Sequence, residues 1–353
     1  MRLTESMHIH ISEPLGTARM SDTVGSAEEA VAYIYNSAVA ASALSAAWDL
    51  GMLDELHDRG EIDAPDFAAR RQLDPRSTVG LLRALAAVGI VHRDGTKAVP
   101  AAYFAEAYRT RAFFHWLMRG SAQLFREIPE VMMEKNRHGE FCRRDSSAIA
   151  RACREISALT YDPWFWQAVE NLEFKPRRIV DLGCGSGERI LRLLRRFPET
   201  HGIGIDIAAA AIKDAADDAD TADLAARVSF LEADVRTMQS RETFDDVELI
   251  TCFMMGHDFW PRDDCIGQLR RIRALFPNAR RFLLGDATRS AVTHDRKFRT
   301  FTLGFELAHD LMGKFLPTVP DWESVFGEGG WSVRRRHFID LAVGEVIFEL
   351  DPA

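Results

Sequence analysis

Residues 179–187 read Ile179-Val180-Asp181-Leu182-Gly183-Cys184-Gly185-Ser186-Gly187, a short apolar run that leads into three glycines at alternate positions. From Glu188 onward, isoleucine and leucine recur at helical spacing. Glycine accepts positive φ angles and lets a ligand approach the backbone, and the N-terminus of the following helix presents unpaired N–H groups at the same point. The pattern predicts a strand, a ligand-binding turn and a helix in an α/β domain.

Strand and helix patterns alternate through the rest of the chain, which is typical of a doubly wound sheet. The strands are expected at residues 178–182, 202–206, 228–232, 247–252, 281–286, 334–339 and 345–350. The closely spaced last pair resembles the antiparallel hairpin that ends the methyltransferase sheet and is not found in a dehydrogenase sheet. We expect an α/β fold with a doubly wound, Rossmann-like methyltransferase sheet.

Acidic residues follow the first three strands of this domain. Asp181 would repel a pyrophosphate but can attract the cationic methionine end of S-adenosylmethionine (SAM), and Asp206 can accept hydrogen bonds from ribose hydroxyls. Asp234 and Val235 follow the third strand, where SAM enzymes place an acid near the adenine amino group and an apolar side chain against the ring. This set resembles the class I SAM-dependent methyltransferases. The resemblance implies further cofactor contacts at Gly183, Gly185, Gly187 and Met254.

The N-terminal part of the chain is expected to be mainly helical. Apolar residues at helical spacing predict two helices between Ala27 and Leu56 that bury a broad face, and further helices begin near Asp63 and Asp74. With the strand and turn expected at 90–95, this order resembles the mainly α winged-helix dimerisation domain of small-molecule O-methyltransferases and implies a homodimer. A DNA-binding wing is the alternative, although recognition helices normally carry more Arg and Lys.

Length, charge and cysteine content limit the possible classes. A chain of 353 residues exceeds one ordinary core, and we expect a flexible N-terminus (1–26), a dimerisation domain (27–105), a helical connector over the active site (106–175) and a SAM-binding domain (176–353). The net charge of −9 argues against a nucleic-acid partner. The five cysteines form no CxxC pair, and no run approaches the ~18 apolar residues of a membrane span. A cytoplasmic enzyme acting on a small molecule is expected.

A His-Asp pair follows the fourth predicted strand, in the run 256–260 (Gly-His-Asp-Phe-Trp). Because ligands bind at the carboxyl ends of the strands in such sheets, His257 and Asp258 are expected in the active site. The run resembles the His-Asp-Trp motif of plant-type O-methyltransferases, in which the histidine deprotonates a substrate hydroxyl. Phe259 interrupts that motif here, and an ordinary exposed His-Asp pair is the alternative.

A second histidine, His309, lies in an apolar helix expected over residues 301–315. Two imidazoles with carboxylates and open positions are typical of a catalytic iron or zinc site, and a buried structural histidine is the alternative. Together with the run 113–121 (Phe-Phe-His-Trp-Leu-Met-Arg-Gly-Ser), the histidines resemble those of the 2-oxo acid C-methyltransferases, which methylate C3 of phenylpyruvate, 2-ketoarginine and related acids. The resemblance implies an iron or zinc ion held by His257 and His309.

The same resemblance assigns a substrate site. Trp116 and Ser121 match pocket positions, and Arg144 matches an arginine that binds the substrate carboxylate. Other arginines compete for that role: Arg119, Arg126 and Arg143. A metal chelated by the 2-oxo acid would stabilise the enolate formed at C3, and the proton acceptor is a hydroxide on the metal, Asp258 or His294.

Aromatic residues around these positions favour a 2-oxo acid with an aromatic or branched apolar side chain, such as phenylpyruvate or indolepyruvate, over 2-ketoarginine. The expected end use is the synthesis of 3-methyl amino acids for natural products. Two other functions stay open on the sequence alone. One is a metal-free O-methyltransferase with His257 as general base. The other is a non-catalytic regulator that binds a small molecule through the methyltransferase fold.

Overall fold

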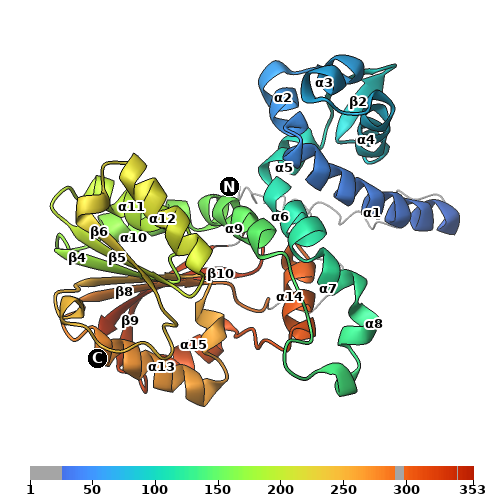
Figure 1. Ribbon diagram of the computed structural model, residues 1–353. Helices are drawn as coiled ribbons and strands as arrows, with labels where there is room; N and C mark the ends of the chain where they lie inside the picture. The colour runs from blue at the N-terminus through green and yellow to red at the C-terminus, as the bar shows by residue number, and fades with distance from the viewer. Residues whose placement is uncertain (1–25, 291–297, 340) are drawn as a thin grey trace, which may run out of the picture. The chain divides into compact units, whose positions relative to one another are not determined.

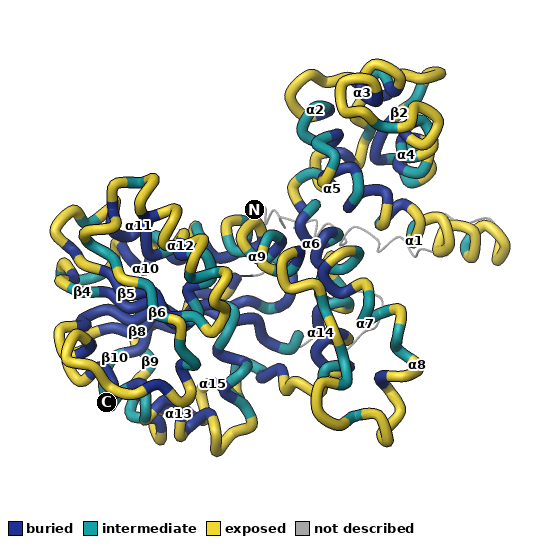
Figure 2. The backbone as a smooth tube through the Cα atoms, in the orientation of Figure 1, coloured by how far each residue is buried: buried dark blue, intermediate teal, exposed yellow. Residues whose placement is uncertain are grey.

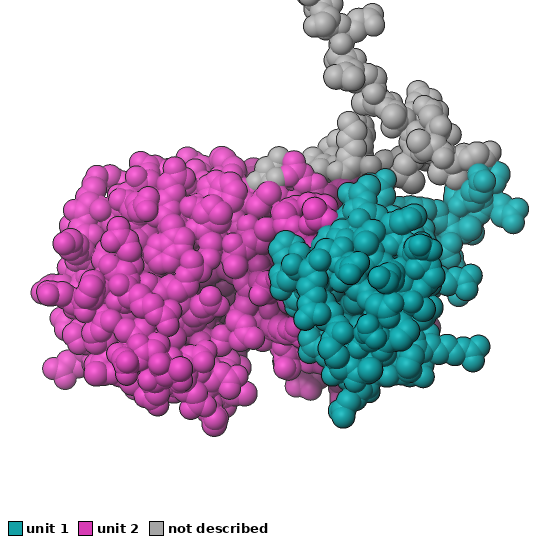
Figure 3. All heavy atoms as spheres, turned by 90° about the horizontal axis from the view of Figure 1, so that it is seen from above, with its two compact units in different colours: residues 1–43, 50–104 teal, residues 44–49, 105–353 magenta. Residues whose placement is uncertain are grey.

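The computed structural model describes residues 26–290, 298–339 and 341–353. The residues up to Ala43 together with Leu50–Phe104 form one compact unit, and Leu44–Asp49 with Ala105–Ala353 form a second (Figure 3). Of the expected flexible segment 1–26, all but Ser26 lies outside the described residues, as does His294.

The first unit combines helices with a small antiparallel sheet of order β1-β3-β2. Its elements are the first part of α1 (Ala27–Asp49), α2 (Met52–Arg59), β1 (Ile62–Asp63), α3 (Ala64–Arg71), α4 (Pro75–Ala87), β2 (Val91–Asp94) and β3 (Lys97–Pro100). The predicted helix starts are confirmed, because the Asp63 and Asp74 side chains accept hydrogen bonds from backbone N–H groups in the first turns of α3 and α4.

Helix α1 buries less of its apolar face than its sequence predicts. Leu44 is fully buried, but Val31, Ile34 and Tyr35 are 66%, 68% and 72% exposed, and Figure 2 shows the start of this helix as exposed. By length and composition α1 could also cross a membrane, with a hydropathy of 1.3 over its best 18-residue window. A single helix of this kind is weak evidence of a membrane span, and Glu28, Glu29 and Asn36 interrupt its apolar residues, so the expectation that no continuous apolar run of that length exists is not contradicted.

The connector between the two predicted domains is helical, as expected. Its elements are α5 (Phe104–Arg109), α6 (Arg111–His115), the π-helix η2 (Trp116–Gly120), α7 (Ala122–Arg126), α8 (Ile128–Val131), η3 (Glu134–Asn136), α9 (Ser146–Thr160) and α10 (Asp162–Glu170). A single π-helical turn such as η2 is rare and is found most often at functional sites.

Seven strands form the sheet of the second unit in the order β6-β5-β4-β7-β8-β10-β9. They are β4 (Arg178–Leu182), β5 (His201–Asp206), β6 (Val228–Glu232), β7 (Leu249–Phe253), β8 (Arg281–Asp286), β9 (Trp331–Ile339) and β10 (Glu345–Pro352). Strands β4 to β8 are parallel, and β10 runs antiparallel to both β8 and β9. The predicted α/β sheet and its closing hairpin are confirmed.

Helices cover both faces of this sheet (Figure 1). Ile179 and Leu249 pack with α10 on one face, while Val180 and Ile250 pack with helices on the other. The remaining elements are α11 (Glu188–Arg196), α12 (Ala209–Thr221), η4 (Ala225–Arg227), η5 (Glu242–Phe244), η6 (Gly256–Phe259), α13 (Arg262–Leu275), α14 (Thr302–Leu311) and α15 (Val319–Phe326). Since both faces are covered, the carboxyl ends of the parallel strands form the edge that is open to ligands.

Helix α14 is shorter than the predicted 301–315. Gly313 adopts a φ of +69°, and the N–H of Lys314 donates to the carbonyl of His309. A left-handed glycine satisfies the last carbonyls of a helix and ends it. Within α14, Phe305 and His309 lie one turn apart, and both are buried.

Candidate active site

The glycine-rich turn lies at the carboxyl end of β4, as predicted. Gly183, Gly185 and Gly187 have φ angles of +70°, +53° and +76°. At Gly187, a Cβ atom would lie 2.8 Å from the ring of Phe230, so both the backbone conformation and the packing exclude a larger residue. Because these three positions carry no side chains, a ligand can approach the backbone N–H groups of the turn.

A cavity of about 330 Å³ lies beside this turn. Five of the predicted cofactor residues line it: Gly183, Asp206, Asp234, Val235 and Met254. Asp206 accepts hydrogen bonds from the N–H groups of Gly185 and Ala208, both at 2.9 Å, which fixes the carboxylate at the end of β5. The Asp206 carboxylate at one end of the cavity suits the ribose hydroxyls of a nucleoside, and the buried Val235 in its wall suits the apolar face of a base.

Asp234 is already paired within the chain. Its two oxygens accept hydrogen bonds from the Arg236 guanidinium, the shorter at 2.9 Å, and these bonds hold the Asp234 pKa below its usual value. An adenine amino group at this position therefore has to share the carboxylate with Arg236.

Asp181 lies beneath the turn and lines neither this cavity nor the larger one beside it. It is fully buried, and its Oδ1 accepts a hydrogen bond of 2.6 Å from the Thr251 hydroxyl. Its other oxygen is buried with no partner among the described residues. Burial raises the Asp181 pKa, and the charge of Arg189 opposes that rise. Its predicted contact with the methionine end of SAM stays a prediction.

His257 is held by a carboxylate that sequence reasoning did not identify. Asp286 ends β8 and is fully buried. Its oxygens accept hydrogen bonds from the backbone N–H of His257 at 2.5 Å and from its Nδ1 at 2.8 Å. Burial alone would lower the His257 pKa, but Asp286 raises it above the usual value. The only sequence signal for Asp286 was its place at the carboxyl end of a predicted strand.

His309 lies next to His257, with ring centroids 5.1 Å apart and ring planes at 81°. Its Nδ1 donates a hydrogen bond of 2.7 Å to the carbonyl of Phe305. Burial, reinforced by the charge of His257, lowers the His309 pKa to about 3. The ring is therefore neutral near pH 7, and its Nε2 keeps a free lone pair.

The two histidines have the donor arrangement of metal ligands. In each ring, Nδ1 is occupied by an oxygen acceptor, the contact that orients metal-binding histidines through their second nitrogen. Among the residues that the structure describes, no group of three or more His, Cys, Asp or Glu side chains is arranged to hold a metal. The described part of the chain thus offers two imidazole nitrogens and no third protein ligand beside them.

Asp258 faces the cofactor cavity, which it lines together with Lys314. The Lys314 ammonium lies 2.7 Å from one of its oxygens. Burial alone would raise the Asp258 pKa, but His257 and Lys314 outweigh it and lower the pKa. A carboxylate stabilised in this way is a poor proton acceptor, which weakens the sequence-based hypothesis that Asp258 is the base.

The surroundings of Arg144 differ from those of the three arginines that compete with it for the substrate carboxylate. Arg119 lies near Asp49, Arg126 pairs with Glu127, and Arg143 is exposed. Arg144 is half-buried, and its guanidinium lies 5.9 Å from the centroid of the Trp116 ring. Burial lowers its pKa, and within the described ranges it makes no ion pair with a carboxylate. Its positive charge also contributes to the lowered pKa of His309, so the two lie within electrostatic range.

Aromatic rings surround the two histidines. Trp116 is buried in η2, and its ring lies 5.0 Å from Phe301 and 5.8 Å from Phe305. Phe301 also stacks on Phe113 at 4.6 Å. Ser121, at the end of η2, is fully buried, and its hydroxyl has no partner within the described chain. The two predicted pocket residues therefore offer an apolar surface, the Trp116 ring, and a hydroxyl on Ser121 that is available to accept or donate a hydrogen bond.

If His257 holds a metal ion, as the resemblance implies, replacing Asp286 with asparagine should lower metal affinity about 10- to 100-fold, the usual effect of altering an outer-shell partner of a metal-binding histidine. An amide can still accept a hydrogen bond from Nδ1–H of His257, but it lacks the negative charge that increases the basicity of the ring. Metal titration of purified protein measures the effect. Glu248→Gln, which alters another buried acid at the opposite end of the strands, should leave the affinity unchanged; an equal loss there would contradict the assignment.

Comparison with known proteins agrees with this geometry. A model of the methyltransferase domain matches residues 179–278, and a model of the O-methyltransferase dimerisation domain matches residues 33–113. Methyltransferase ungE' of Aspergillus campestris (strain IBT 28561) is 46% identical over 331 residues, covering 92% of this chain and 97% of that protein. Indolepyruvate C-methyltransferase of Streptomyces griseus is 30% identical over 325 residues, covering 90% and 93%.

A solved structure of PigF with SAH has the same fold, with a TM-score of 0.66 and 20% identity over 93% of this chain and 100% of that one. That likeness shows the shared fold. The 46% identity to methyltransferase ungE' covers 92% of this chain, so the family assignment applies to nearly the whole sequence. The chain belongs to the SAM-dependent methyltransferases that carry an O-methyltransferase dimerisation domain.

Proposed function

We propose that the enzyme transfers the SAM methyl group to C3 of an aromatic 2-oxo acid such as phenylpyruvate or indolepyruvate. The observation that carries this proposal is the pair of buried histidines, 5.1 Å apart between ring centroids, with both Nδ1 atoms occupied. The similarity to a protein named indolepyruvate C-methyltransferase supports the same substrate class.

The chain's own residues would bind and orient the acid. His257 and His309 would hold an iron or zinc ion, both of which accept imidazole ligands. Such an ion acts as a Lewis acid on the negative charge that develops on the enolate oxygen. Arg144, which has no ion pair with a carboxylate in the described part of the chain, would bind the substrate carboxylate, and the ring of Trp116 would contact the aromatic side chain.

The bonds that change are few. The C3–H bond breaks as its proton passes to a general base, for which Asp258 is the candidate within the described residues, and the electron pair of that bond enters the enolate. The C3 carbon then attacks the methyl group in line, and the S–CH3 bond breaks with its electron pair going to sulfur. The products are the 3-methyl-2-oxo acid and S-adenosylhomocysteine. Because the sulfonium already activates the methyl group, positioning and exclusion of water are the main tasks of the protein. The 3-methyl acid would serve as a precursor of 3-methyl amino acids.

A second candidate function rests on the Asp286–His257 contact. A carboxylate on Nδ1 orients the ring so that Nε2 can take a proton from a hydroxyl. With no metal bound, the same site would support O-methylation with His257 as general base. In that case His309 would be a buried structural histidine.

The position of the transferred methyl group separates the two functions. The enzyme is incubated with phenylpyruvate and SAM that carries a 13C-labelled methyl group, and the product is examined by nuclear magnetic resonance. We expect a C–CH3 group coupled to the proton on C3. An O–CH3 signal would support the second function, and an absence of label transfer to phenylpyruvate, indolepyruvate and 2-ketoarginine would contradict the proposal.

We also propose a homodimer formed through the first unit. The exposed apolar residues of α1, including Val31, Ile34 and Tyr35, belong to a segment that overlaps the matched dimerisation domain, and exposed apolar faces of this kind mark protein interfaces. Cytoplasmic localisation stays a prediction. Light scattering should give twice the 39.8 kDa chain mass, and a monomer at micromolar concentration would contradict the dimer.

A further inference from the structure

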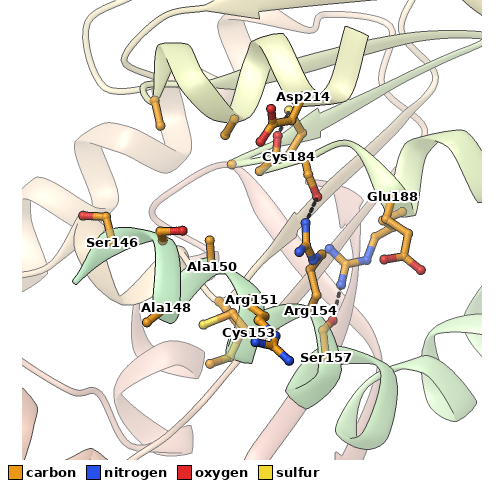
Figure 4. Close-up of a pocket in the computed structure, with 18 of the residues that line it drawn as sticks. Ser146, Ala148, Ala150, Arg151, Cys153, Arg154, Ser157, Cys184, Glu188 and Asp214 are labelled. Atoms are coloured by element: carbon orange, nitrogen blue, oxygen red, sulfur yellow. Dashed lines mark hydrogen bonds between the residues drawn. The ribbon is translucent and has the colours of Figure 1, made fainter. Parts of the chain in front are cut away.

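Two neighbouring cavities lie beside the glycine turn. The larger, of about 900 Å³, shares Gly183, Phe253 and Met254 with the smaller cavity assigned above to the nucleoside. Figure 4 shows its wall, where α9 faces the turn that begins α11. A ligand whose nucleoside occupies the smaller cavity therefore extends past Gly183 into the larger one, which is where the methionine chain of the cofactor would lie.

Several arginines line the larger cavity: Arg119, Arg151, Arg154, Arg189 and Arg192. Three of them have carboxylate partners. Arg151 lies 2.7 Å from Asp49, Arg119 lies 3.7 Å from the same residue, and Arg192 pairs with Asp162. Arg119 and Arg151 thus share one carboxylate, and Arg192 has a carboxylate of its own.

Arg154 and Arg189 differ from the others. In the part of the chain that the structure describes, each donates to a hydroxyl, Arg154 to Ser186 at 3.3 Å and Arg189 to Ser157 at 2.7 Å, and neither has an ion pair with a carboxylate within 4 Å. Figure 4 marks both hydrogen bonds. Two cations on one cavity wall without a contacting carboxylate among the described residues favour an anionic ligand.

Arg189 is fixed in place by its surroundings. Its guanidinium carbon lies 3.9 Å from the centroid of the Phe253 ring, one of the residues shared by both cavities. Its Nε is buried without a partner among the described residues. A stacked guanidinium loses little conformational entropy when it binds a planar carboxylate.

We infer that Arg154 and Arg189 bind the α-carboxylate of the methionine part of SAM. The cofactor is zwitterionic at that end, and charge-assisted bonds from guanidinium groups are the strongest and most directional available to a carboxylate. The two arginines then select the complete amino-acid end of the methyl donor. The inference rests on the nucleoside position proposed above, and it is independent of which acid is methylated.

Binding measurements by calorimetry test this assignment without requiring turnover. The ligands are S-adenosylhomocysteine and its decarboxylated analogue, which differ by the carboxylate alone. The wild-type enzyme should prefer the former. Arg154→Met and Arg189→Met should each weaken S-adenosylhomocysteine binding about 10- to 100-fold and change binding of the analogue less than about threefold.

Arg192→Met is the matched control, since Arg192 lines the same cavity on the same helix but is paired with Asp162. It should retain the wild-type preference for S-adenosylhomocysteine over the decarboxylated analogue.

Arg154 is exposed, so its replacement tests the inference even if Arg189→Met fails to fold. Equal losses for both ligands would assign the arginines a structural role only. Unchanged cofactor binding with a raised KM for the 2-oxo acid would show that they bind the substrate carboxylate instead. Either result would overturn the inference.

Discussion

His309→Ala is expected to remove bound metal from the enzyme and to lower kcat/KM for phenylpyruvate about a thousandfold. A Lewis acid on the developing enolate charge supplies several kcal/mol, and each 1.36 kcal/mol corresponds to about a factor of ten in rate. His309 suits this test better than His257, because removal of the His257 ring would also leave the buried Asp286 carboxylate without that partner. Elemental analysis and steady-state kinetics on the same preparation measure both effects.

His201→Ala is the control for a lost imidazole, since His201 is exposed at the start of β5, the opposite end of the strand from the site. It should keep full metal content and activity. If the wild-type enzyme is fully active after exhaustive treatment with a chelator, the metal-assisted account is wrong. Retained activity in His309→Ala would lead to the same conclusion and favour His257 as a general base.

The strands of the sheet could be predicted closely from the sequence, because each is a short apolar run with charged residues or glycine close to its ends. The bounds of β4, β6 and β8 agree with the predictions to the residue. Each is a short run rich in apolar residues that begins at or directly after an arginine. Strands β4 and β8 are buried along nearly their whole length, as expected for parallel strands covered on both faces, whereas β6 is the partly exposed edge strand. Helix α14 was predicted too long because apolar residues continue beyond the glycine at which it ends.

The contacts within the site could be predicted less well, because they join residues that are far apart in sequence. Topology predicted that His257 lies at the carboxyl edge of the sheet, but its contact with Asp286 depends on the adjacent register of β7 and β8. The choice of Arg144 among four arginines depends on which side chains already have partners. That information exists only after folding, when Asp49 and Glu127 engage Arg119 and Arg126 and the chain leaves Arg143 exposed.

Arg144→Met is expected to raise KM for phenylpyruvate about a hundredfold, the upper range for loss of a hydrogen bond to a charged group. Methionine keeps much of the apolar contact with the Trp116 ring but removes the cation. Affinity for S-adenosylhomocysteine should not change, since Arg144 lines neither of the two cavities beside the glycine turn. Arg144→Lys should recover only part of the loss, because an ammonium cannot form the bidentate contact.

Arg143→Met provides the matched control, because it removes an exposed arginine from the adjacent position and should leave KM within about twofold, as is usual for surface substitutions. Methyl phenylpyruvate, which lacks the carboxylate charge, adds an independent comparison. The wild-type enzyme should discriminate strongly against this ester, whereas Arg144→Met should treat the acid and the ester alike. If the variant still preferred the acid, the carboxylate would be bound by another cation, and the larger cavity with Arg154 and Arg189 would be the first place to search.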